Sequence, residues 1–423
     1  MITLQYIREN KDEAIERLAI RGLDATETVN AIAATDVEKR KKQTELESTL
    51  AEANSLAKEI GNLFKSGKTD EATVLKAKTA DLKEREKVLQ VEADELEAKI
   101  YDLLVSLPNT PALFVPKGKT PEENVTVFEH GEIPVLHEGA KPHWELTTQY
   151  SLIDFELGNK ITGAGFPVYT GKGARLQRAL INFFLDEAGA AGYTEFQMPL
   201  MVNAASGFGT GQLPDKEGQM YHATVDDLYL IPTAEVPITN MYRDVILKAD
   251  QFPIMSMGYT PCFRREAGSY GAHVRGLNRL HQFDKVEIVQ IQHPDKSYDT
   301  LEQMKEHVKG LLTKLELPFR ILHLCGGDMG FASACTYDFE VYSTAQQRWL
   351  ECSSVSNFET FQANRLKLRF KDTDGKTKLA HTLNGSALAL PRIVAALLEN
   401  HQTPDGIKIP AALVPYTGFD KIS

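Results

Sequence analysis

Hydrophobic positions follow two different patterns along the chain, and the change between them falls near residue 110. From about Asp36 to Leu107 the sequence has little glycine, no proline, and much glutamate, lysine, alanine and leucine, a composition typical of long helices. Apolar residues recur there in steps of four and three, which predicts two coiled-coil seams. The first seam comprises Leu46, Leu50, Ala53, Ala57, Ile60 and Phe64, and the second comprises Leu89, Ala93, Leu96, Ile100, Leu103 and Leu107.

A short turn, residues 66–70, separates the two seams and includes Gly67, which readily adopts a positive φ. Helices joined by so short a turn pack antiparallel, so we expect a helical hairpin over about residues 36–107. At 1.5 Å per residue, legs of about 30 to 35 residues make an arm of roughly 50 Å. Such an arm can bind a partner, or it can only dimerise or space domains. The lysines that flank the turn are candidates for phosphate contacts, although they also suit a solvated face: Lys65, Lys68, Lys76 and Lys78.

The second part of the chain predicts an α+β domain. Pro108 and Pro111 end the second helix, so we expect an N-terminal domain over 1–110, a linker over 111–125 and a larger domain over 126–423. In the larger domain, short β-branched stretches at 254–257, 286–289, 319–324 and 339–342 predict strands, and 173–188 and 385–400 predict helices. Because these elements do not alternate regularly, an antiparallel sheet flanked by helices is favoured.

Composition excludes several classes of protein. Apolar content of 42% with 25% charged residues is that of a soluble globular protein, and no apolar run approaches the roughly 20 residues of a membrane span. The acidic N-terminus predicts no signal peptide, and four cysteines without a CxxC pair suit reduced thiols, so we expect a cytoplasmic protein. A net charge of −11 argues against coating nucleic acid indiscriminately but permits local basic patches.

The segment from Cys262 to Glu287 is the strongest candidate for chemistry. It predicts a strand with Arg264 and Glu266 on one face, then a long basic loop with three glycines, then a second strand. A long basic loop between apolar strands more often serves binding than packing. The sequence contains neither a P-loop nor a GxGxxG dinucleotide motif, so any nucleotide is held in another way.

Phe263-Arg264-Arg265-Glu266 resembles the FRxE of motif 2 in class II aminoacyl-tRNA synthetases, and the residues that follow are similar to the seryl enzymes, bacterial type. Further segments occur in the order of that family over essentially the whole chain: His143-Trp144-Glu145-Leu146, Gly192-Tyr193-Thr194-Glu195 with Pro199, Thr233-Ala234-Glu235, 351–358 and Asn384-Gly385-Ser386. The resemblance places motif 1 at about 180–202, motif 2 at about 258–290 and motif 3 at about 381–396. It implies a homodimer that activates serine with ATP and transfers it to tRNA(Ser), and to tRNA(Sec) as well.

The resemblance also implies roles for individual residues. Arg264, Glu266 and Arg392 would be catalytic: Arg264 bridges the α-phosphate and the serine carboxylate, and Arg392 holds the γ-phosphate. Glu351 and Ser354 would bind Mg²⁺, a hard ion suited to oxygen ligands. The implied ATP contacts are Arg264, Arg265, Glu266, Leu280, Phe283, Glu351, Cys352, Ser353, Ser354 and Arg392, the implied serine contacts are Thr233, Glu235, Arg264, Glu287, Asn384 and Ser386, and Arg275 and Arg279 join the arm lysines as tRNA contacts.

Simpler interpretations remain for several of these positions. Phe283 on a strand suits a core residue, Arg392 a surface charge, and Ser386 the first turn of a helix. The chain also departs from the commonest family pattern at Arg265, at Cys352 and at Pro391, which puts backbone contacts of the ATP site in doubt. Two other functions compete: a synthetase-like paralogue that charges a carrier protein, and a non-catalytic coiled-coil scaffold. The arm and the basic loop argue against the first, and the retained charged residues argue against the second.

Overall fold

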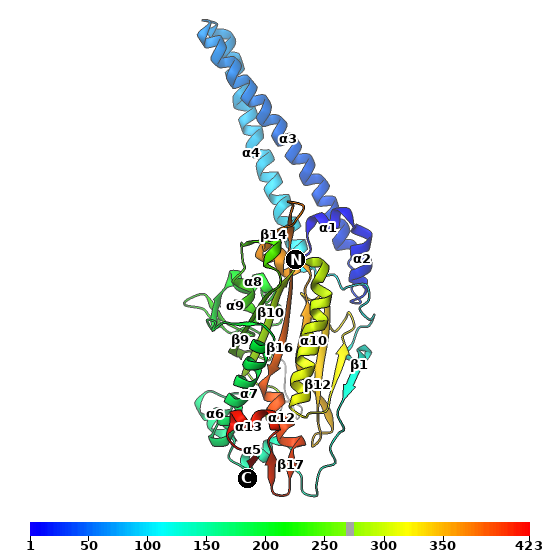
Figure 1. Cartoon of the computed structure of the whole chain (residues 1–423). Helices are drawn as coiled ribbons and strands as arrows, with labels where there is room; N and C mark the ends of the chain where they lie inside the picture. Colours follow the sequence, from blue (N-terminus) through cyan, green and yellow to red (C-terminus); the bar gives the residue numbers. More distant parts are fainter. Residues whose placement is uncertain (268–274) are drawn as a thin grey trace. The chain divides into compact units, whose positions relative to one another are not determined.

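The computed structural model describes residues 1–267 and 275–423, and the chain divides into two compact units. Unit 1 comprises residues 1–19 and 23–108, and unit 2 comprises residues 20–22 and 109–423. Figure 1 traces both units from the N-terminus to the C-terminus. Within the described residues, no helix is both long enough and apolar enough to cross a bilayer.

Unit 1 is helical, and its two long helices form the predicted antiparallel hairpin (Figure 1). Its elements are α1 (Leu4–Glu9), α2 (Lys11–Ala19), α3 (Thr26–Lys65) and α4 (Thr69–Ser106). The first leg begins at Thr26 rather than near Asp36, because Val29 and Ile32 are buried where α3 packs on α1 and α2. The turn uses Gly67 at φ +77°, as expected of a glycine.

The seam of α3 differs from the prediction toward the tip of the hairpin. Leu56 is buried and Ala57 is exposed, while Phe64 is 50% exposed. From Leu46 onward, the buried positions of α3 therefore begin with a three-residue step, from Leu46 to Thr49. The prediction began with a four-residue step, from Leu46 to Leu50. Both steps keep residues on one helical face, so leucine and alanine spacing alone did not separate them. In α4, the predicted positions Leu89, Ala93 and Ile100 are buried, as is Leu107 directly after the helix.

Unit 2 is built on an eight-stranded sheet, which confirms the predicted α+β class. All neighbouring strands pair antiparallel except the short edge strand, which runs parallel to its neighbour. In spatial order the strands are β1 (Val125–His130), β11 (Phe319–His323), β12 (Cys335–Ser343), β13 (Arg348–Asn357), β16 (His381–Ala389), β10 (Gln282–Gln292), β9 (Ile254–Phe263) and β4 (Thr194–Glu195).

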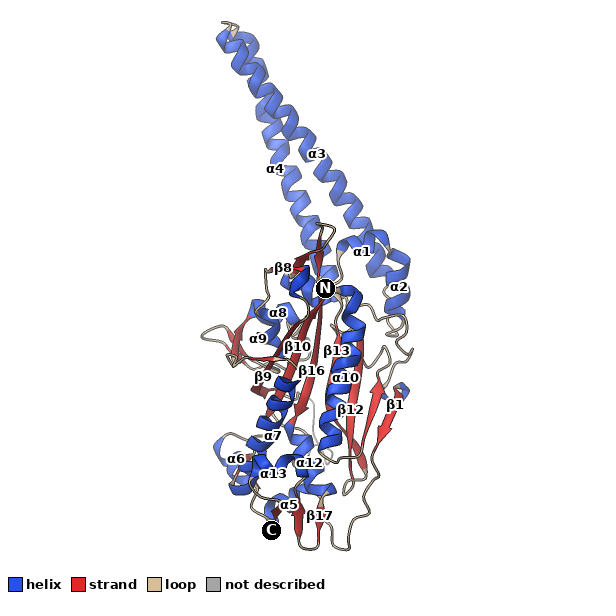
Figure 2. Cartoon of the chain, in the orientation of Figure 1, coloured by secondary structure: helices blue, strands red, loops and turns tan. Residues whose placement is uncertain are grey.

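Three helices cover one face of this sheet (Figure 2): α7 (Gly171–Ala190), α10 (Ser297–Lys314) and α12 (Leu390–Asn400). Because side chains alternate along a strand, β10 shows which residues face the helices. Val286 and Ile288 lie in the main hydrophobic core with residues of α7, α10 and α12, whereas Val289 packs with Ala234 and Ile238 on the opposite side. The odd-numbered residues of β10 therefore face away from the three helices.

The prediction of one helix over 385–400 was wrong in its first part. Residues 381–389 form β16, which pairs with β10 and β13, and α12 begins at Leu390 with Pro391 in its first turn. Alanine and leucine suit a buried strand as well as a buried helix, so the run itself did not reveal the change. Ser386 is consequently a strand residue and not part of a helix N-terminus. The predicted helix over 173–188 is confirmed within α7.

Shorter elements complete unit 2 around the sheet. They are α5 (His143–Gln149), β2 (Ile153–Asp154), α6 (Phe155–Ile161), β3 (Val168–Tyr169), β5 (Met201–Asn203), α8 (Ala204–Thr210), β6 (His222–Ala223), β7 (Leu228–Leu230), α9 (Glu235–Asn240), β8 (Ile246–Lys248), α11 (Thr360–Leu366), β14 (Arg369–Lys371), β15 (Thr377–Leu379), β17 (Gln402–Thr403), β18 (Gly406–Lys408), α13 (Val414–Thr417) and β19 (Lys421–Ile422). The four cysteines are buried free thiols.

Candidate functional site

Three predicted serine-site residues share the sheet face that points away from α7, α10 and α12. Glu287 on β10 lies opposite Ser386 on β16, and Val289 lies opposite Asn384. Residues directly opposite on paired strands point to the same face, as do residues two apart on one strand. Glu287, Ser386 and Asn384 therefore lie on one face, with Glu287 and Ser386 buried and Asn384 partly exposed.

A buried lysine that the sequence analysis missed lies at the centre of this cluster. Lys285 is 5% exposed, its Nζ lies 2.5 Å from Glu287 Oε2, and it donates to Thr233 Oγ1 at 2.8 Å. The Thr233 hydroxyl in turn lies 3.3 Å from Glu287 Oε2. A lysine is rarely buried unless it is paired, and its position two residues before Glu287 was the available signal. The lysine fixes two side chains that were predicted to contact serine.

Glu235 adds a second carboxylate to the same cluster. It is the first residue of α9, it is buried, and its Oε1 accepts a hydrogen bond from Gln362 Nε2 at 2.6 Å. Burial and the nearby Glu287 carboxylate raise the pKa of Glu235 to about 7, although Gln362, Lys285 and Arg264 act in the opposite direction. The site thus holds one carboxyl group that changes charge near neutral pH and so can pair with a cation.

Arg264 lies beside this cluster but not on the strand where it was predicted. β9 ends at Phe263, and the Arg264 backbone N–H still donates to His281 O at 2.9 Å. The Arg264 guanidinium carbon lies 5.2 Å from the centre of the Phe283 ring, and its Nε donates to Pro232 O at 3.4 Å. Phe283 is only partly buried at the edge of the core. An arginine and an aromatic face therefore border the carboxylates, a combination suited to a phosphate and a base.

Glu266 also lies beyond the strand, so the prediction that it shares a strand face with Arg264 was wrong. Its φ of +48° shows that the chain has left the extended conformation. Its carboxylate pairs with Arg279, which returns from the motif 2 loop, while Arg265 is exposed. Residues 268–274 of that loop lie outside the described residues. Arg275, predicted to contact tRNA, has its guanidinium carbon 4.9 Å from the centre of the Trp144 ring.

Oxygen ligands gather on β13 and β12. The Ser354 hydroxyl lies 3.5 Å from Glu351 Oε1, and Asp338, which the sequence analysis missed, lies opposite Ser354. Burial and the Glu351 charge raise the pKa of Asp338 well above its ordinary range, and its buried Oδ1 has no hydrogen-bond partner among the described residues. A buried acceptor without a donor suits a cation, so Asp338, Glu351 and Ser354 are the residues here that could hold a hard metal ion.

Arg392 lies next to these oxygens. Its Nη1 donates to Glu351 O at 2.6 Å and lies 3.7 Å from Glu351 Oε2, and its Nε donates to Asn278 O at 3.1 Å. Cys352, the residue after Glu351, packs in the main hydrophobic core, and the Ser353 hydroxyl donates to Ser386 O at 2.6 Å. Neither side chain therefore faces Glu351 and Arg392. Leu280 is likewise buried in the core. The structure therefore leaves only the backbone of Cys352 and Leu280 for contact with a ligand.

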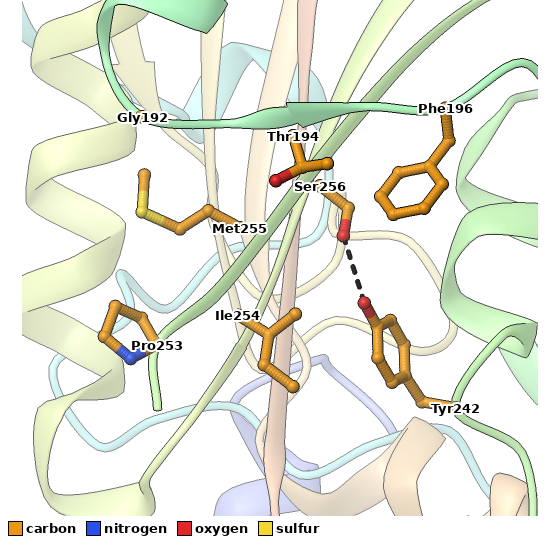
Figure 3. A pocket seen from close by; sticks show the side chains of 8 residues that line it. All are labelled: Gly192, Thr194, Phe196, Tyr242, Pro253, Ile254, Met255 and Ser256. Atoms are coloured by element: carbon orange, nitrogen blue, oxygen red, sulfur yellow. Dashed lines mark hydrogen bonds between the residues drawn. The ribbon is translucent and has the colours of Figure 1, made fainter. Parts of the chain in front are cut away.

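A pocket of about 290 Å³ lies elsewhere on unit 2 (Figure 3). Its lining comes mainly from β4 with its flanking residues and from the start of β9, and the Tyr242 hydroxyl lies 3.2 Å from Ser256 Oγ. None of its lining residues belongs to the cluster of Thr233, Glu235, Lys285 and Glu287. Three of them, Gly192, Thr194 and Phe196, lie in the segment predicted as motif 1.

The lysines at the tip of the hairpin in unit 1 are all exposed. Lys68 pairs with Glu71 at 3.1 Å and Lys78 pairs with Glu52 at 2.8 Å. Exposed ion pairs of this kind contribute little to stability, because water and salt screen them. Both lysines can thus exchange their carboxylate for a phosphate at little cost, and Lys65 and Lys76 are exposed as well.

Comparison with protein families matches both units. Residues 1–111 match the seryl-tRNA synthetase N-terminal domain, and residues 220–401 match the class II tRNA synthetase core domain (G, H, P, S and T). A serine–tRNA ligase of Salinibacter ruber is 50% identical over 100% of this chain and 99% of its own. The chain belongs to the seryl-tRNA synthetase family.

Other members of the family agree with this assignment. A serine–tRNA ligase of Akkermansia muciniphila is 46% identical over 100% of this chain and 99% of its own. The crystal structure of the Pyrococcus horikoshii seryl-tRNA synthetase in complex with ATP superimposes with a TM-score of 0.94, at 35% identity, over 100% of this chain and 99% of that chain. The chain is therefore a class II synthetase with the activity of a serine–tRNA ligase.

Proposed function

We propose that the two units divide the reaction: unit 2 forms seryl-adenylate from serine and ATP, and the hairpin of unit 1 holds the tRNA that receives the serine. The observation that carries the first half is the buried cluster of Thr233, Glu235, Lys285 and Glu287 beside Arg264. Buried charges persist only when they are paired. A buried cluster of two carboxylates and a lysine, with an adjacent arginine, suits a small zwitterion with a hydroxyl group.

Serine would bind by its three polar groups. Glu287 and Ser386, opposite each other on β10 and β16, accept from and donate to the hydroxyl, while Lys285 keeps the Glu287 carboxylate oriented. Glu235, with Thr233 at its backbone N–H, pairs with the ammonium group. A pocket that hydrogen-bonds a hydroxyl rejects alanine strongly, because its polar groups would otherwise remain buried without partners. Asn384, two residues from Ser386, closes the same face.

ATP would lie across Phe283 toward Arg392. Arg264 reaches both the serine carboxylate and the α-phosphate, so it counters the negative charge that builds up as one attacks the other. Phe283 offers its ring to the adenine, and Glu266 with the backbone carbonyl of Arg265 offers acceptors to the base edge, since the Arg265 N–H donates to Gln219 O. Arg392 takes the γ-phosphate in place of its present contact with Glu351.

Glu351 and Ser354 would hold Mg²⁺, with Asp338 as a third oxygen donor. These residues would hold the ion, which would supply positive charge to offset that of the ATP phosphates. The buried Oδ1 of Asp338, which has no hydrogen-bond partner in the described part of the chain, supports this position. Binding of a cation would also favour the ionised form of Asp338, whose pKa burial and Glu351 now raise.

The tRNA partners are tRNA(Ser) and tRNA(Sec), held on the hairpin by Lys65, Lys68, Lys76 and Lys78 and near the active site by Arg275 and Arg279. Such phosphate contacts position RNA without reading its sequence. The native state is a two-fold homodimer in the cytoplasm. β4 is the edge strand of the large sheet, and an exposed edge with an adjacent pocket suits a second copy.

Serine-dependent ATP–pyrophosphate exchange tests the proposal. The purified chain is assayed with each of the twenty amino acids, and exchange is expected with serine alone. Exchange without subsequent charging of tRNA(Ser) would favour the paralogue that loads a carrier protein. Absence of exchange with every amino acid would favour the scaffold, and preference for another amino acid would refute the assigned serine pocket.

A further inference from the structure

His143, the first residue of the His143-Trp144-Glu145-Leu146 segment, is fully buried. The proposed function assigns no role to it. We propose that His143, held by Glu399, is a positioning residue for the ATP site. It fixes the returning limb of the motif 2 loop, defined here as residues 275–279. The inference rests on the proposed role of unit 2 in binding ATP, and it adds a residue that touches neither ATP nor serine.

The geometry of His143 fixes where its proton lies. Its Nδ1 is 2.7 Å from Glu399 Oε1, and its Nε2 accepts a hydrogen bond from the Leu277 backbone N–H at 2.9 Å. A backbone N–H can only donate, so Nε2 carries no proton. The proton of the neutral ring is therefore on Nδ1, directed at the Glu399 carboxylate. The imidazole thus links an acid on α12 to the backbone of the limb with one defined tautomer.

Glu399 is itself held firmly. Its Oε1 also accepts from the His143 backbone N–H at 3.0 Å and from Gln346 Nε2 at 3.2 Å, and its Oε2 accepts from the Ser343 hydroxyl. Burial opposes ionisation of Glu399, but the donors from His143 and Ser343 hold its pKa below the ordinary value. A carboxylate held by all these partners has a fixed position, so it also fixes the orientation of the His143 imidazole. Carboxylates orient metal-binding histidines in the same way.

The limb that His143 holds carries contacts to both ends of the proposed ATP site. Asn278 O accepts from Arg392 Nε at 3.1 Å, and Arg279 pairs with Glu266. Leu277, between the imidazole and these two residues, is 1% exposed. A shift of the limb at Leu277 would therefore move two residues together: Asn278, which binds Arg392, and Arg279, which pairs with Glu266.

The limb lies directly against the imidazole. Gly276 has a φ of +69°, and a Cβ added there would come 2.3 Å from His143 Nε2. Any larger side chain at this position must displace either the limb or the ring. The close approach explains why the backbone N–H of the next residue reaches Nε2.

Two substitutions of His143 separate the contacts of its two nitrogens. Asparagine places its amide at the position of Nδ1, so H143N keeps the contact with Glu399 and loses Leu277. Glutamine reaches the position of Nε2, so H143Q can still accept from Leu277. Loss of one buried hydrogen bond that orders the limb is expected to raise the Kd and KM for ATP about tenfold in H143N. H143Q, the conservative variant, is expected to recover most of that affinity, and the KM for serine should change little in either.

The Kd for ATP is measured by calorimetry without serine, alongside exchange kinetics and melting temperature. Gly276→Ala serves as a second probe, because it displaces the limb while His143 and Glu399 remain, and it should also weaken ATP. Equal ATP affinity in H143N and H143Q, or an unchanged Kd in Gly276→Ala, would refute positioning by His143. A wild-type chain that binds ATP but shows no exchange with serine would instead refute the proposed function.

Discussion

The ionisation of Glu235 gives the most quantitative test of the serine pocket. Burial and the Glu287 charge raise its pKa from the ordinary 4.5 to about 7. Between these two values the folded state binds a proton that the unfolded chain has released. The free energy of unfolding therefore falls as pH rises through this window, by up to about 1.4 kcal/mol per pH unit. Below the window, and above pH of about 7, this group adds no slope.

Glu235→Gln removes the titration and keeps an oxygen that can accept from Gln362 Nε2. The melting temperatures of wild type and variant are measured from pH 4.5 to 8.5. Titrating groups common to both proteins cancel in the difference between the two melting temperatures. The variant should gain stability relative to wild type as pH rises to about 7, and the gain should then level off. A difference in melting temperature that does not depend on pH would refute the raised pKa.

The same group sets an expectation for binding. The ionised carboxylate is needed to pair with the serine ammonium group, so the KM for serine of wild type should fall as pH rises through about 7. In Glu235→Gln the KM should be higher and should lack this dependence. A wild-type KM that rises over this range would show that Glu235 does not face the ammonium group.

Three further outcomes follow from the site and the sheet edge. Arg264→Ala should lower serine-dependent exchange by at least about 10²-fold, the scale for one oriented donor in a transition state. Activity within threefold of wild type would refute the catalytic role of Arg264. Glu287→Ala should weaken serine and lose discrimination against alanine, so unchanged serine kinetics would mean that the pocket is placed wrongly. Light scattering at micromolar concentration should give about twice the 47.1 kDa of one chain, and a monomer mass would contradict the homodimer.

The sequence predicted those parts of the fold that repeat a simple period. The hairpin followed from heptad spacing and one glycine turn, and the α+β class followed from short β-branched stretches. Ser386 shows where periodicity fails, because an alanine- and leucine-rich run crosses from β16 into α12 without a change of composition. The seam of α3 shows a second failure, since a choice between steps of three and four needs the partner helix.

Candidate site residues were predicted by resemblance, and the contacts between them were not. Lys285 and Asp338 were missed because a lysine two residues from a glutamate, or an aspartate on a strand, suits an exposed position in sequence. Lys285 is buried only when β10 meets Thr233, and the Asp338 Oδ1 is covered only when β12 pairs with β13. Arg264 and Glu266 were placed on one strand because an alternating pattern does not show where pairing ends.

The division of labour between the two units is tested most directly by removing the arm. Residues 40–100 are replaced with a short Gly/Ser linker, which can join the two remaining ends because α3 and α4 pack side by side along the hairpin. A full-length control with Lys65, Lys68, Lys76 and Lys78 changed to alanine keeps the hairpin and removes these four positive charges. Serine-dependent exchange should stay within a few-fold of wild type in both, while tRNA charging should fall by orders of magnitude without the arm, mainly through KM for tRNA. Normal charging of tRNA by the armless enzyme would contradict the account.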